Sequence, residues 1–205
     1  MSSFATSGAS AGDWTGYYDG QGDREPRDLL LHALRSFDAE GRVGVAVDLG
    51  AGQGFETAEL LRRGWDVLAI DAEEEGIRRL RERIPVEHAD RLRTLVSPMQ
   101  EPPLPPADLV HASFSLPFCP PEAFPDLWRR IRSALTPGGR FVGELFGDRD
   151  TWATDPSMTF HDVSAARARF DGLELESFVE EEEDGEAFSG PKHWHVFHVI
   201  ARQPG

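Results

Sequence analysis

The spacing of apolar and polar residues alternates along this chain between a pattern typical of strands and a pattern typical of helices. This alternation predicts alternating strands and helices. Short apolar runs rich in β-branched residues predict five strands, at residues 43–48, 65–70, 93–97, 108–112 and 140–146. Apolar residues at helical spacing predict four helices, at 55–63, 73–83, 121–135 and 163–170. Two extended segments, 173–182 and 195–201, then follow with no helical pattern between them.

This order of elements predicts an α/β fold. Strands that alternate with helices are typical of a parallel sheet with helices on both faces. The two final segments have only a short connection, so we expect them to form an antiparallel hairpin at one edge of the sheet. Residues 1–12 are small and polar, and we expect a mobile arm there, followed by a single domain over 13–205.

Composition narrows the classes of partner. The 205 residues include 36 acidic and 21 basic side chains, a formal charge of -15. Nucleic acids and anionic membranes bind mainly through Lys and Arg, so we expect neither as a partner. The single cysteine, Cys119, cannot form an internal disulfide. With no apparent signal peptide or membrane span, this favours a cytoplasmic location.

A glycine-rich loop follows the first predicted strand. The segment Asp48-Leu49-Gly50-Ala51-Gly52-Gln53-Gly54 ends that strand and opens the first helix. Glycines let the backbone turn tightly and approach a ligand, and the helix start offers unpaired N–H groups. Asp71 ends the second strand, where a carboxylate can accept hydrogen bonds from both hydroxyls of a ribose. The combination predicts a nucleotide site rather than a simple turn.

The spacing of the glycines separates two nucleotide classes. A dinucleotide fingerprint needs glycine at position 55, which is Phe55, so the pattern disfavours NAD. The loop instead resembles the first motif of class I S-adenosylmethionine-dependent methyltransferases, with Asp48, Gly50, Gly52 and Gly54 matching. Asp71, the segment 108–110 and the Leu-Thr-Pro-Gly-Gly turn at 135–139 resemble three further motifs of that family, in the same order.

The resemblance implies a Rossmann-like sheet of seven strands, with the last strand antiparallel and beside the fifth. It implies S-adenosylmethionine as the cofactor, with Met99 and Gln100 beside the adenine, although Pro98 stands where the family often has Asp. The N-terminal segment is similar to that of small tellurite-resistance-type methyltransferases. There it covers the methionine end of the cofactor, so Tyr18 and Arg27 are candidates for its carboxylate, although the tyrosine can equally be a packing residue.

The resemblance also divides the domain. We expect an N-terminal lid and helix over 13–40, a cofactor-binding core over 43–146, and acceptor loops with the C-terminal hairpin over 147–205.

Acceptor residues are expected at the carboxyl ends of the parallel strands, where ligands bind in open α/β sheets. The histidines that this rule selects as a base or an orienting group are His111, His193 and His195. Aromatic residues at the same edge can wall a pocket or belong to the core. His193 and His195 share a strand face, but no compact third and fourth ligand accompanies them, so no metal site is predicted.

The favoured hypothesis is transfer of a methyl group from S-adenosylmethionine to a small-molecule acceptor, by a monomer or a homodimer. Two alternatives stay open. One is a non-catalytic sensor or interaction module that binds S-adenosylmethionine without turnover. The other is a nicotinamide-dependent dehydrogenase, which the glycine spacing disfavours.

Overall fold

The computed structural model describes residues 14–205, so the arm expected at residues 1–12 lies outside the described residues. The helices are α1 (Trp14–Gln21), α2 (Asp28–Ala39), α3 (Phe55–Arg62), α4 (Glu74–Arg83), α5 (Phe124–Ala134) and α6 (Val163–Ala168). The strands are β1 (Val45–Leu49), β2 (Asp66–Asp71), β3 (Leu92–Val96), β4 (Ala107–Ala112), β5 (Leu135–Gly147), β6 (Phe160–His161), β7 (Glu174–Ala187) and β8 (Gly190–Arg202). Short 3-10 helices cover Val86–Arg91, Leu116–Phe118 and Thr151–Thr154.

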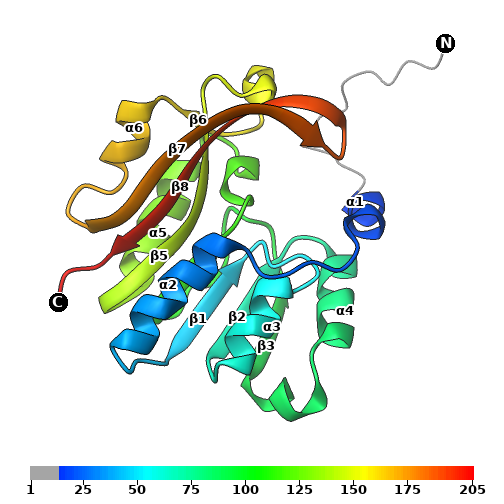
Figure 1. Cartoon of the computed structure of the whole chain (residues 1–205), viewed down its shortest axis with the longest axis vertical. Helices are drawn as coiled ribbons and strands as arrows, with labels where there is room; N and C mark the ends of the chain where they lie inside the picture. Colours follow the sequence, from blue (N-terminus) through cyan, green and yellow to red (C-terminus); the bar gives the residue numbers. More distant parts are fainter. Residues whose placement is uncertain (1–13) are drawn as a thin grey trace.

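The strands form one sheet in the order β3-β2-β1-β4-β5-β8-β7, which Figure 1 shows with its helices. The first five strands are parallel, and β8 pairs antiparallel with both β5 and β7. This confirms the mostly parallel sheet and the antiparallel strand beside the fifth. The short β6 is an eighth strand that the sequence did not indicate, because its two residues, paired with the end of β5, show no periodicity.

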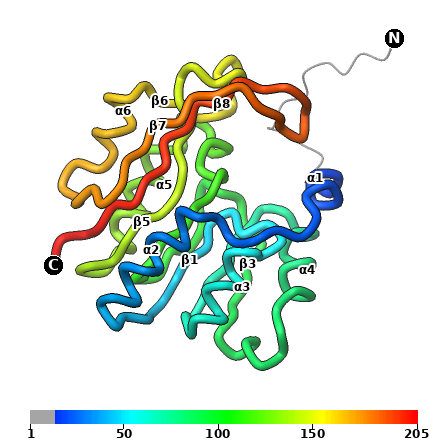
Figure 2. Tube along the Cα trace, in the orientation of Figure 1, coloured from blue at the N-terminus to red at the C-terminus, as the bar shows by residue number. Residues whose placement is uncertain are grey.

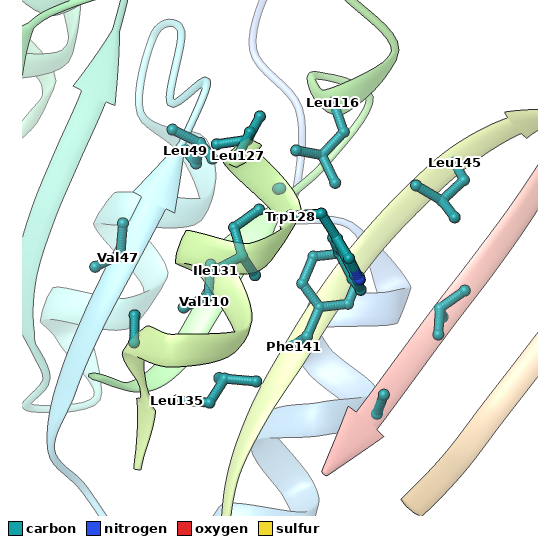
Figure 3. Close-up of a cluster of buried hydrophobic side chains, with 14 of the residues drawn as sticks. Val47, Leu49, Val110, Leu116, Leu127, Trp128, Ile131, Leu135, Phe141 and Leu145 are labelled. Carbon is teal, nitrogen blue, oxygen red and sulfur yellow. The ribbon is translucent and has the colours of Figure 1, made fainter. Parts of the chain in front are cut away.

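Apolar side chains on the two faces of the sheet form separate cores. On one face, Leu127, Trp128 and Ile131 of α5 pack against strand residues such as Val110 and Phe141, as Figure 3 shows. On the other face, α2 and α3 contribute Leu34, Phe37 and Leu60 among others. Burying both faces explains why β1 and β4 are almost continuously apolar.

The hairpin of β7 and β8 runs along one edge of the sheet, and its turn lies near α1 (Figure 2). Its register continues from Glu174 opposite Arg202 to Ala187 opposite Gly190. The guanidinium of Arg140 on β5 is 2% exposed and bonds Glu176 of β7 and Glu40 at the end of α2, which ties the hairpin to the rest of the sheet. Among the helices of residues 14–205, none has the length and hydropathy needed to cross a membrane.

Candidate active site

A cavity of about 310 Å³ opens at the carboxyl ends of β1, β2 and β4, where the parallel strands place their loops. All the residues predicted to bind the cofactor, apart from Gly54, line it: Tyr18, Arg27, Asp48, Gly50, Gly52, Asp71, Met99 and Gln100. His111 also lines it, whereas His193 and His195 do not. The chain therefore brings the glycine loop, the acidic strand end and one of the three candidate histidines together.

The glycine loop is shaped by left-handed backbone at three positions. Gly50 has a φ of 80°, and a Cβ there would lie 2.3 Å from the Cβ of Ser115. Gly54 has a φ of 79° at the N-cap of α3, and a Cβ there would lie 2.4 Å from Leu80. Gly54 thus supports the cavity from behind by letting α3 approach α4, while Gly50 and Gly52 form its floor.

Asp71 is held in position by the backbone. Its carboxylate accepts hydrogen bonds from the N–H of Gly52 at 2.7 Å and from the N–H of Glu73 at 2.9 Å. Burial raises the pKa of this carboxyl, although the two backbone donors oppose the shift. Each oxygen keeps one further lone-pair direction, so the group can still accept two hydroxyls.

Asp48 and His111 form a buried pair at the ends of β1 and β4. His111 Nδ1 lies 2.9 Å from Asp48 Oδ1, and the other oxygen of Asp48 accepts from the Thr57 hydroxyl at 2.6 Å. Burial alone would lower the pKa of His111, but the hydrogen bond and negative charge of Asp48 outweigh it, so the pKa is raised. Because Nδ1 faces Asp48, Nε2 is the ring nitrogen left for a molecule in the cavity.

The segment before α2 covers the cavity and is tied to α3. Arg24 forms a bidentate pair with the buried Glu56, at 2.6 and 3.0 Å, and the backbone N–H of Arg27 donates to the same carboxylate. The α1 residue Tyr18 is buried between Gly52 and Gly76, where its ring lies 3.6 Å from a Cβ built on Gly52. Tyr18 therefore has a packing role as well as lining the cavity.

Arg27 differs from Arg24 in its partners. Its guanidinium carbon lies 4.3 Å from the ring centroid of Phe114, and its Nε is buried with no hydrogen-bond partner among the described residues. An arginine that lines a cavity with an unused donor is suited to an anionic group such as a carboxylate.

Aromatic side chains form part of the lining of the cavity. The lining includes three such residues, here called the aromatic wall: Trp14, Phe114 and Phe118. The rings of Trp14 and Phe118 meet edge to face, with their centroids 5.1 Å apart. Phe114 has a φ of 50°, and its backbone N–H donates to the buried carboxylate of Glu144 at 3.0 Å. Since left-handed backbone is unfavourable for phenylalanine, this hydrogen bond helps to hold the loop after β4.

Comparison with known proteins agrees with this geometry. A family profile described as "Methyltransferase domain" matches residues 46–139. The magnesium-protoporphyrin O-methyltransferase of Rhodobacter capsulatus is 36% identical over 94 residues, which cover 45% of this chain and 42% of that protein. Residues 46–139, slightly less than half of the chain, are thus similar to a methyltransferase domain.

Solved structures share the fold of this chain. TehB from Haemophilus influenzae has a TM-score of 0.70 at 16% identity, over 93% of this chain and 65% of that one. The glycopeptide N-methyltransferase MtfA complexed with S-adenosyl-L-methionine has a TM-score of 0.58 at 18% identity, over 84% and 93%. The chain thus spans less than half of the curated relative and about two thirds of TehB.

Two of the candidate histidines lie in a separate cluster outside the cavity. His195 is fully buried, with Nε2 3.0 Å from Glu180, and the exposed His193 contacts Glu182 and Asp184. The physical reason is lateral position: β8 lies on the far side of β5, so its start reaches the same edge of the sheet but not the cavity between β1 and β4.

Arg149 is the cation of this second cluster. Glu180, Glu182 and His195 bring one ligand atom each within 4.8 Å of one another. The guanidinium already bonds both carboxylates at 2.7 to 2.9 Å and lies 3.1 Å from His195 Nε2. The two carboxylates and the imidazole therefore already have a partner in Arg149. Together they form an ion-pair network that holds the loop after β5 to the hairpin.

The sequence did not point to Glu56 or Arg24, which the fold brings together at the cavity. An acidic residue in the first turn of a helix is common for reasons of helix stability alone, so Glu56 carried no specific signal. The two residues are 32 positions apart, and their pairing depends on how α1 and the segment before α2 fold back over α3.

Proposed function

We propose that this protein transfers a methyl group from S-adenosylmethionine to a small-molecule acceptor. The observation that carries the proposal is that a glycine floor, the carboxylate of Asp71 and the guanidinium of Arg27, with its unused Nε donor, line one cavity. A cofactor that carries both a ribose and a carboxylate matches this set of residues. The structural likeness to MtfA complexed with S-adenosyl-L-methionine supports the same choice.

The residues present fit the cofactor on physical grounds. Gly50 and Gly52 leave a floor that a Cβ at Gly50 would fill, which lets a ligand lie directly on the backbone. Asp71 would accept the ribose hydroxyls, Arg27 would pair with the carboxylate beside Tyr18, and Met99 and Gln100 would border the adenine. Bound there, S-adenosylmethionine supplies an electrophilic methyl carbon, and alignment of the acceptor can provide much of the rate acceleration.

The acceptor is proposed to be small because the cavity is covered by α1 and the segment before α2, which limits the space beside the methyl group. The proposal includes no nucleic-acid or membrane partner, because the net charge of -15 repels phosphate surfaces. It also includes a cytoplasmic location, supported by the single, buried and unpaired Cys119. A monomer or a homodimer is proposed as the assembly.

Calorimetric titration with S-adenosylhomocysteine tests the proposal. Asp71→Ala is expected to weaken binding at least tenfold, because two hydrogen bonds to a charged group are lost, each contributing about 1.5 to 3 kcal/mol. Asp66→Ala is the matched control, since Asp66 begins the same strand at its exposed, opposite end. Equal affinities of the two variants would remove Asp71 from the site. Tight binding of NAD with no binding of S-adenosylhomocysteine would overturn the proposal.

A non-catalytic sensor remains the second candidate, and turnover separates it from the enzyme. The Asp48–His111 pair beside the aromatic wall favours catalysis, because a sensor has no use for a base at the end of its ligand cavity. Binding without methylation of any acceptor in a broad panel would favour the sensor.

A further inference from the structure

We infer that the acceptor is an aryl hydroxyl, whose proton His111 removes while Asp48 orients the imidazole. This inference rests on the proposed methyl transfer and names the substrate class of the same cavity. It depends on two independent features of the same cavity. These are the buried Asp48–His111 pair and the aromatic wall of Trp14, Phe114 and Phe118.

The buried pair indicates an acceptor that must lose a proton. With Nδ1 at 2.9 Å from Asp48, Nε2 is positioned to accept a proton from a group in the cavity, and the carboxylate stabilises the resulting imidazolium. Acceptors differ in their need for such a base. A thiol ionises near pH 8.5 without help and an arylamine attacks as a neutral group, whereas a phenol resembles tyrosine, with a pKa near 10.

The aromatic wall selects the shape of the acceptor. Phe114 packs against a second layer of aromatic rings. Its ring centroid lies 5.9 Å from that of Phe146 and 6.0 Å from that of Trp194. Trp14 meets Phe118 edge to face from the covering helix. A planar ring can fit against such faces and edges, and each aromatic contact contributes about 0.5 to 1.5 kcal/mol beyond its buried area.

The two features together favour a phenol over an aliphatic alcohol. His111 can act as a general base toward either kind of hydroxyl, so the aromatic wall makes the distinction, because aromatic side chains favour contact with a planar aryl ring. In the step, Nε2 of His111 takes the hydroxyl proton and the phenolic oxygen bonds the methyl carbon. The carbon–sulfur bond breaks with its electron pair on sulfur, so S-adenosylhomocysteine leaves and the proton passes from His111 to water.

Position and charge around His111 are consistent with a titrating base. Asp48 faces it from β1, Glu56 from α3 and Glu144 from β5, while Arg24 and Arg27 line the same cavity. The acidic groups raise the pKa of the imidazole above its ordinary 6.5. Because only neutral His111 can accept a proton, kcat/KM should rise with pH through a value above 6.5. Asp48→Asn should move this rise to lower pH.

The first experiment compares acceptors on the unmodified protein. The panel contains substituted phenols, the matching anilines, cyclohexanol, thiophenol and selenite, each with S-adenosylmethionine. Phenols are expected to be methylated at least tenfold faster than the other classes. Preference for an aniline, a thiol, an aliphatic alcohol or selenite would overturn the inference and leave methyl transfer standing. Failure to bind S-adenosylhomocysteine would instead overturn the proposed function.

The second experiment separates a base from a structural histidine. His111→Gln should lower turnover of phenol by about 100-fold, within the usual range for general-base catalysis. With a nitrophenol that is already ionised in mildly alkaline buffer, the loss should fall below about tenfold, because no proton remains to be removed. His32→Gln, on the exposed side of α2, is the control and should change neither rate. An equal loss with both acceptors would contradict the role of His111.

A third measurement does not depend on turnover. Phenol binding to the complex with S-adenosylhomocysteine is followed by calorimetry, and the pKa of His111 by NMR. Phe118→Leu should weaken phenol binding at least threefold without changing affinity for S-adenosylhomocysteine. Asp48→Asn should lower the pKa of His111 in the same complex, with that affinity measured alongside. An unchanged pKa, or phenol binding insensitive to Phe118, would overturn the inference.

Discussion

Lys192 offers a sharp test of how the loop after β5 is held to the hairpin. It is the only lysine of the chain, its side chain is 1% exposed, and it forms a salt bridge with the fully buried Asp150. Its ammonium lies 3.6 Å from the ring centroid of Trp194 and 4.3 Å from that of Trp152. The charge is thus enclosed by one carboxylate and two indole faces.

Lys192→Met removes the cation and keeps most of the apolar stem. The carboxylate of Asp150 would stay buried, bonded only to the backbone N–H groups of Trp152 and His195. Removing one partner of a buried ion pair lowers the free energy of unfolding by about 3 to 5 kcal/mol, because the other charge is left uncompensated. For a chain of this size the loss corresponds to a decrease in Tm of roughly 6 to 20 °C.

Urea unfolding followed by tryptophan fluorescence and by circular dichroism measures this loss. The double variant Lys192→Met with Asp150→Asn should be more stable than Lys192→Met alone, since the unpaired charge is gone. Arg129→Met is the surface control, because its pair with Asp126 is exposed on both sides and should change little. A loss below about 1 kcal/mol for Lys192→Met would refute the reasoning on buried charge.

The same pair predicts a dependence on pH. Burial lowers the pKa of Lys192 from its ordinary 10.5, and the hydrogen bond that Lys192 donates to Asp150 only partly opposes the shift. Between the lowered value and 10.5 the unfolded chain binds more protons, so this group's contribution to stability rises with pH in that window. In Asp150→Asn the opposing carboxylate charge is lost and the window should extend to lower pH, which urea unfolding at several pH values would show.

Two further substitutions test the floor of the cavity and the tie between sheet and hairpin. Gly50→Ala places a Cβ 2.3 Å from Ser115 at a φ of 80° and should weaken S-adenosylhomocysteine binding at least tenfold in calorimetry. Gly41→Ala, at a φ of 62° with nothing within 4 Å and at the opposite end of α2 from the segment that covers the cavity, should leave binding unchanged. Arg140→Met removes the buried guanidinium between α2 and β7 and should lower the free energy of unfolding in urea by about 2 kcal/mol. A change within experimental error would mean that its carboxylate partners are solvated well enough without the guanidinium.

Much of the fold follows from local patterns. Gly64 and Pro85 mark where the helices before them end, and the glycine loop marks the turn from β1 into α3. The grouping of Asp48, Gly50 and Asp71 around one cavity was predictable for the same reason, because these residues lie in short motifs at strand ends. These signals lie within a few residues of one another along the chain.

The acceptor side was harder to predict because it depends on lateral distance. The strand-end rule places His111 and His195 at one edge of the sheet, but it does not say how far apart they lie. In the structure β5 separates β4 from β8, so His111 enters the cavity and His195 packs against Gly147 instead, where a Cβ would overlap its ring. The pair of Arg24 and Glu56 depends on a chain reversal that no local pattern encodes.

The contact between the covering helix and the hairpin has a consequence for synthesis of the chain. The ring centroid of Tyr17 in α1 lies 6.0 Å from that of Phe188 in the turn between β7 and β8. The two residues in this contact are thus about 170 positions apart along the chain. The glycine floor can form while the chain is still being translated. The segment that covers the cavity precedes the glycine floor in the chain but gains its outer support only after the β7–β8 hairpin has folded, so a ligand that binds beneath it would report on molecules in which this hairpin is folded.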